Sequence, residues 1–101
     1  MSKVVKIELD KERNLIYDFR AVRDFEKVTG KNILKPDTWE NLSGTDVSVM
    51  LWACLKVDEP ALTIDDVAAL LNMENMKYCM EKIIEASGTN NQSPLAGSLT
   101  S

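Results

Sequence analysis

The sequence predicts an α+β fold that is mainly helical, in which an N-terminal β-hairpin packs on a bundle of about four helices. Apolar and polar residues alternate over residues 3–19, as in strands with one buried face. The apolar period then becomes helical near residue 20, and two later apolar runs each follow a helix-capping sequence. We expect one globular domain over residues 1–87 and a disordered, flexible tail over residues 88–101, where small polar residues dominate.

The composition is that of one small domain. The chain has 101 residues, of which 45% are hydrophobic and 28% are charged, and this length leaves room for a single core. The net charge of -4 argues against nucleic acid as a partner, because nucleic-acid binders usually carry a basic face. The sequence shows no secretory signal and no apolar run long enough to span a bilayer. We therefore expect a cytoplasmic protein with no membrane partner.

The hairpin and the first helix follow from the change of period. A lone hairpin is marginally stable in water, so its apolar face should pack on the helices. The first helix is expected over residues 20–29, because its apolar stripe ends at Gly30, which suits the left-handed conformation that closes a helix. The apolar face of the hairpin is expected to comprise Val5, Ile7, Leu9, Leu15, Tyr17 and Phe19.

The connection "KNILKPDTWENLSG" is expected to be a loop with apolar anchors, because Pro36 biases Lys35 away from helical conformation. The next two helices begin at capping boxes, Ser43 to Asp46 and Thr63 to Asp66. In each box the hydroxyl accepts a hydrogen bond from an early backbone N–H, and the carboxylate reaches back. An acidic turn with a proline separates the two runs. Helices are therefore expected over residues 44–57 and 64–72.

The last helix is expected over residues 74–87, with Met73, Met76 and Met80 on one face. Methionines at this spacing can belong to the core, but they also suit a groove that adapts to several apolar segments. The sequence leaves both interpretations open.

Trp52 lies on the helix expected over residues 44–57, whose apolar residues cover a broad arc and leave a narrow polar strip of Ser48 and Lys56. Trp52 is four residues from each of these and so projects from the polar side. Either the connection 36–42 or the hairpin covers it, or it is an exposed anchor of the kind enriched in interface hot spots. The expected partner-binding surface comprises Trp52, Leu55, Lys56, Met73, Met76 and Met80.

The residues on which most catalytic sites depend are missing. The chain has no histidine, which is the usual general base and the commonest metal ligand. Its four glycines are too dispersed for a phosphate-binding loop. Cys54 and Cys79 each lie in an apolar helical pattern, which favours two buried thiols over a disulfide or a metal pair. We expect a binding protein that is not an enzyme and has no cofactor and no metal.

Two blocks of the sequence resemble the tail assembly chaperones of long-tailed bacteriophages, prophages and gene transfer agents. The first block, "IELDKERNLIYDFRAVRDFEKVTGKNIL", contains the pattern F-E-x-x-T-G-x-N at residues 25–32. The second, "LWACLKVDEPALTIDDVAALL", contains L-W-A-x-L at residues 51–55 and then an acidic-proline turn before Leu62 and Thr63. The resemblance covers roughly residues 5–85.

This resemblance implies a cytoplasmic assembly factor that is absent from the finished particle. Such a factor coats the long, helical tape measure protein while tail tube subunits polymerise around it. The family also implies a homo-oligomer, with the tail tube protein as a further candidate partner. Such chaperones are often made in a short and a frameshifted longer form, and this chain would be the short form.

A rival interpretation is a small DNA-binding regulator, because residues 62–83 resemble a helix-turn-helix with residues 75–82 as the recognition helix. That helix carries Asn75, Lys77 and Lys82, which suit base edges, but glutamates and apolar residues lie between them. A plain helical hairpin explains the same pattern.

Overall fold

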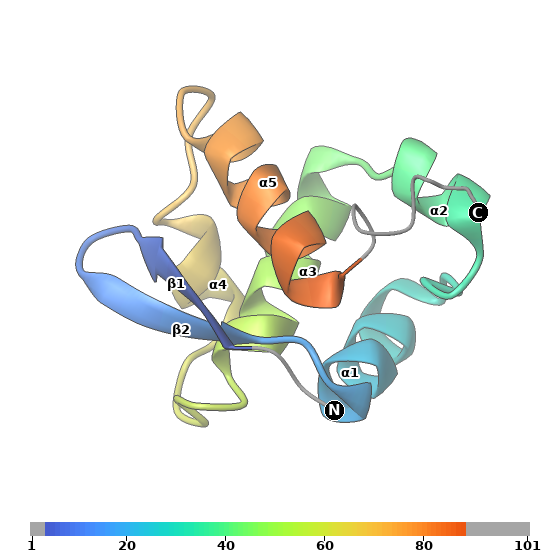
Figure 1. Ribbon diagram of the computed structural model, residues 1–101, viewed down its shortest axis with the longest axis horizontal. Helices are drawn as coiled ribbons and strands as arrows, with labels where there is room; N and C mark the ends of the chain where they lie inside the picture. The colour runs from blue at the N-terminus through green and yellow to red at the C-terminus, as the bar shows by residue number, and fades with distance from the viewer. Residues whose placement is uncertain (1–3, 89–101) are drawn as a thin grey trace.

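The computed structural model describes residues 4–88, and its fold is α+β and mainly helical, as the sequence predicts (Figure 1). The tail expected beyond Gly88 lies outside the described residues. Two antiparallel strands are followed by helices that surround one central helix. The elements are β1 (Val4–Glu8), β2 (Glu12–Ile16), α1 (Phe19–Thr29), α2 (Pro36–Glu40), α3 (Gly44–Leu55), α4 (Ile64–Ala68) and α5 (Met76–Ser87).

The hairpin pairs Val4 with Ile16 and Glu8 with Glu12. Its turn is shorter than the polar segment suggested, because β2 already begins at Glu12. The predicted apolar face is confirmed for the buried Val5, Ile7 and Leu15, and Leu9 and Tyr17 are partly buried. Next to the turn, at the end of β1, the backbone N–H of Glu8 donates to the Tyr78 hydroxyl on α5 at 2.9 Å. The last helix therefore holds the hairpin directly.

The prediction for Phe19 was wrong, because this residue belongs to a helix. The carboxylate of Asp18 accepts a hydrogen bond from the backbone N–H of Arg20 at 2.8 Å and so caps α1. The helix starts at Phe19, where the spacing changes from two to 3.6 and the side chain turns to solvent. As predicted, α1 closes at Gly30, whose φ of 74° is in the left-handed region.

The predicted loop after α1 contains a short helix, α2, and this was not expected. Lys35 is extended, with φ of -84° and ψ of 129°, as the following proline requires. Pro36 itself opens the helix, because the N–H that proline lacks would have no helical partner at the first position. The indole N–H of Trp39 donates to the carbonyl of Ile33 at 2.9 Å, which folds α2 back on the connection.

Helix α3 is the centre of the molecule, as Figure 1 shows: α1, α4, α5 and β2 all pack against it, and α5 also packs on both strands. The long apolar run therefore builds the core. Both capping boxes are formed as predicted. The buried apolar residues of α3 are Val47, Val49, Met50, Leu51, Ala53, Cys54 and Leu55.

The ends of three helices differ from the prediction. α3 ends at Leu55, α4 already ends at Ala68, and α5 begins at Met76. Two asparagines make the break before α5. The Asn72 side chain accepts hydrogen bonds from two following backbone N–H groups, at 2.9 and 2.8 Å, and the Asn75 side chain donates to the carbonyl of Leu70 at 2.9 Å. These side-chain bonds replace helical ones.

Candidate functional site

The residues predicted to form one partner-binding surface lie in two separate places, and one of them is not on the surface. Leu55 has no exposed area and belongs to the core, so its assignment to a binding surface was wrong. Trp52 and Lys56 lie at the C-terminal end of α3. The terminal methyl of Met76 packs beside Gly44, at the opposite end of the same helix. The six residues therefore do not make a single patch.

Trp52 is half-buried. It is therefore neither fully covered nor a fully exposed anchor, the two alternatives left open by the sequence. Its indole N–H donates to the backbone carbonyl of Leu62 at 3.0 Å, so the segment just before α4 fixes its orientation. The Lys56 ammonium lies 5.1 Å from the ring centroid, within cation–π distance. Trp52 therefore joins α3 to the α3–α4 connection and leaves only part of the ring for a partner.

Lys56 connects two helices. Its Nζ lies 2.9 Å from Oδ2 of Asp24 on α1, and Nε of Arg23 lies 3.3 Å from the other carboxylate oxygen. Burial raises the pKa of Asp24, but the hydrogen bonds from Lys56 and Arg23 outweigh it and hold that pKa below its usual 3.8. Asp24 is therefore ionised at neutral pH and is shared by both cations.

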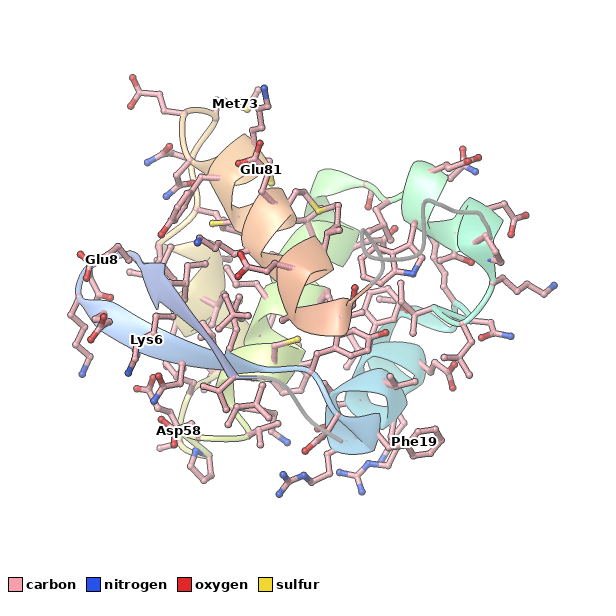
Figure 2. All side chains as sticks on the ribbon, viewed as in Figure 1. Lys6, Glu8, Phe19, Asp58, Met73 and Glu81 are labelled. Atoms are coloured by element: carbon pink, nitrogen blue, oxygen red, sulfur yellow. The ribbon has the colours of Figure 1, made fainter. Side chains whose placement is uncertain are left out.

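The three methionines range from exposed to half-buried. Met73 is 91% exposed and precedes α5, so the predicted helical face does not include it. Figure 2 shows it at the far tip of the turn before α5. Met76 and Met80 lie on α5 and are partly buried against the core. The side chain of Met73 is thus the most accessible apolar group of the predicted set.

Several of the residues that carry the family resemblance have a role in folding. In the first block, Phe25 is buried and Thr29 Oγ1 donates to its carbonyl at 2.8 Å, while Gly30 closes α1. In the second block, Leu51 is core, and Thr63 opens the second capping box. These residues therefore stabilise the domain itself. Trp52 of the second block is only half-buried and keeps part of its ring accessible.

Arg13 is a charged residue at an inward position of β2, and it is not among the residues predicted to form a site. Its Nε and Nη2 lie 2.9 Å from the two carboxylate oxygens of Asp10, and Nη1 lies 2.6 Å from Oε1 of Glu59. The hydrogen bonds from Arg13 hold the pKa of Asp10 below its usual 3.8. Because Leu15 is two residues further on and buried, period two could have revealed that Arg13 points inward.

The cysteines are buried, as predicted, and they are free thiols. Burial raises the pKa of Cys54, so its thiol is protonated and unreactive at neutral pH. The part of the chain that the structure describes contains no group of three or more side chains that could hold a metal ion. Within the same residues, no helix has both the length and the hydropathy to cross a membrane.

The two helices of the rival helix-turn-helix interpretation are α4 and α5. The connection between them, residues 69–75, has seven residues, whereas helix-turn-helix units use a turn of about three or four. On α5, the exposed Lys77 and Glu81 are one turn apart, so their opposite charges offset each other on the face that would meet DNA.

Comparison of the chain with known proteins finds no match among family models, among curated proteins or among solved structures.

Proposed function

We propose that this protein is an assembly chaperone that binds a long, helical client with apolar stripes and keeps it soluble until assembly. By its resemblance, the client is the tape measure protein of a long-tailed phage or prophage, in the cytoplasm of the host. The tail tube protein is a further candidate partner, and several copies of the chain would act together.

The observation that carries this proposal is the accessible methionine in the turn before α5. Met73 is 91% exposed, and Met76 and Met80 follow it half-buried. Unbranched thioether side chains adapt to apolar surfaces of different shape. A client with repeated apolar stripes would be held by many such weak sites, and linking weak sites in one assembly raises the overall affinity steeply.

Two further features support a binding function. The buried charged side chains of the described residues, Arg13, Asp24 and Asp46, are committed to a cap and to ion pairs that hold the fold. The half-buried ring of Trp52 offers a second apolar contact at the other end of α3. Small apolar contacts at separate places suit a protein that covers a long partner.

The test is co-expression of this chain with the tape measure protein, scored by the soluble fraction of the client and by co-purification. We expect a soluble complex with the natural chain. Met73→Ser should reduce the soluble fraction severalfold, with a change in unfolding free energy within about 0.5 kcal/mol, because the side chain makes few contacts. Leu34→Ser, at a residue that is 65% exposed, is the matched control. A client that stays insoluble with the natural chain would contradict the proposal.

The DNA-binding alternative has a direct test of its own. Retention on duplex DNA that falls steeply with added salt would favour it, because phosphate contacts release counterions. The seven-residue connection and the offset charges of α5 lead us to expect no retention.

A further inference from the structure

The outward face of α1 is an exposed surface to which the proposed function assigns no role. The opposite face of this helix packs on α3 through Ala21, Val22 and Phe25, all buried. Phe19 is 75% exposed and Arg23 lies one turn further on, so their side chains are neighbours. Figure 2 shows Phe19 pointing away from the domain, on the opposite side of the view from Met73.

A shallow groove runs beside this face, between α1 and the α3–α4 connection. Its volume is about 240 Å³. Val57 and Pro60 give it an apolar wall, and cationic side chains from two helices surround it. The groove is lined by Arg20, Arg23, Asp24, Lys56, Val57 and Pro60.

On this face the positively charged side chains are more exposed to solvent than the negatively charged ones. The side chains of Arg20 and Arg23 are 63% and 57% exposed, whereas their carboxylate partners Asp18 and Asp24 are 15% and 11% exposed. Arg23 uses only Nε in its ion pair. Both of its Nη atoms have no acceptor among residues 4–88 and are available to a ligand. A partner therefore meets guanidinium groups first.

We propose that the face formed by Phe19, Arg20, Arg23 and the neighbouring groove binds an acidic protein segment that carries an apolar side chain. Phe19 contacts the apolar side chain. The two arginines donate to carboxylates, which match the planar guanidinium group in pairs of hydrogen bonds. Because the chain as a whole has a net charge of -4, an acidic segment is repelled by most of the surface and attracted here.

The overall negative charge also favours an acidic protein segment over a nucleic acid as the ligand of this face. A nucleic acid presents a continuous row of phosphates, and the overall negative charge of the chain opposes it. A short acidic segment needs only the local cations. The inference rests on the proposed function, in that the segment belongs to the client, and it adds a second class of contact to the apolar ones.

The experiment uses the full chain and two labelled peptides of about 18 residues, in which leucines at helical spacing are combined with glutamate in one peptide and with lysine in the other. Binding is followed by fluorescence anisotropy at low and at high salt. We expect the glutamate peptide to bind and the lysine peptide not to bind. Added salt should weaken the binding, because exposed charges are screened.

Variants locate the binding site. Arg23→Glu and Phe19→Ser should each weaken binding of the glutamate peptide by about tenfold or more. Lys77→Glu on the exposed start of α5 is the charge-matched control, and Leu34→Ser is the apolar control; neither should change the affinity. Circular dichroism checks that each variant is folded.

Several outcomes would overturn the inference: equal affinity for both peptides, the same loss in Lys77→Glu as in Arg23→Glu, or tighter binding of duplex DNA that competes with the peptide. A chain that self-associates through Phe19 and binds no peptide would overturn it too, in favour of a contact between copies. If Arg23→Glu and Phe19→Ser solubilise the tape measure protein as well as the natural chain does, this inference fails while the proposed function stands. If the natural chain itself does not solubilise the client, the proposed function fails.

Discussion

Helices α3 and α4 begin with the same chemistry and then differ in length. In α3, Ser43 Oγ accepts from the backbone N–H of Asp46 at 3.1 Å, and the Asp46 carboxylate accepts from that of Ser43 at 3.0 Å. In α4, Thr63 and Asp66 make the same two bonds at 3.0 and 3.1 Å. α3 nevertheless has 12 residues and α4 has five. A capping box thus starts a helix without deciding where it ends.

The difference lies in what each helix buries. Neighbours cover α3 on nearly every side, whereas Val67 is the buried residue of α4. Packing supplies most of the stability of helices in proteins, so the longer helix is the one with more core contacts. The capping carboxylates also differ in burial. Asp46 of α3 is buried and paired with Lys31, whereas Asp66 of α4 is exposed.

The largest effect is expected from truncation inside α3. Leu55→Ala should lower the unfolding free energy by about 3 kcal/mol, since it removes a fully buried side chain and leaves a cavity. The matched change Ile64→Ala, at a half-buried residue of α4, should cost clearly less. Urea unfolding measures both. Equal losses of unfolding free energy would contradict the view that α3 depends more on buried contacts than α4 does.

Removal of the capping carboxylate should also destabilise the protein more in α3 than in α4. Asp46→Ala should cost about 2 kcal/mol, because a part-buried backbone N–H and the Lys31 ammonium both lose their acceptor. Asp66→Ala should cost about 0.5 to 1 kcal/mol, the usual value for an exposed cap. If the exposed cap proved the more costly one, burial would not explain the difference.

Trp52→Phe tests the contact by which α3 and the start of α4 are joined. The substitution keeps an aromatic ring but removes the N–H that donates to the carbonyl of Leu62, and we expect a loss of about 1 kcal/mol. Trp39→Phe, which removes a similar bond to the Ile33 carbonyl, is the control outside these two helices. No loss in the Trp52 variant would show that water replaces the bond without cost.

The smallest difference is expected in acid, between the natural chain and Asp46→Ala. Burial raises the pKa of Asp46, but hydrogen bonds from Lys31 and the Ser43 backbone outweigh it, so that the pKa lies below its usual 3.8. A carboxyl with a lowered pKa stabilises the fold above about pH 4, and this contribution is lost as the pH falls through the folded-state value. Unfolding curves from about pH 7 to about pH 3 should therefore converge for the two proteins. A constant gap would contradict the assigned pKa direction.

Much of the frame could be predicted from local patterns. The capping boxes, the left-handed Gly30 and the apolar arc of α3 each depend on residues close in sequence, and all three are confirmed. The start of α5 could not be predicted from apolar spacing, because asparagine side chains compete there with the helix. Pro36 favours a loop through its effect on Lys35, but proline is equally suited to the first residue of a helix, where the structure places it.

The candidate site was less predictable because exposure depends on contacts between distant segments. A helical projection places Leu55 on the apolar arc and Trp52 on the polar side, but it does not say which elements cover either side chain. Leu55 proved to be core, and Trp52 is held by a carbonyl ten residues away. The alternating pattern places Phe19 at the end of the hairpin and so does not predict its exposure on α1. Of the six residues predicted to bind a partner, Met73 is the one that is highly exposed.

The inward-pointing Arg13 has a consequence for the order in which the chain can fold. A shift of the strand register by one residue would expose Arg13 and bury Asn14, so the ion pair with Glu59 selects the native register. That partner is 46 positions away, and the Tyr78 hydroxyl that holds Glu8 is 70 positions away. The hairpin is synthesised before both of these residues, so the contacts that fix its register can form only after Glu59 and α5 have been made. Until then its two strands are not held in register by these contacts.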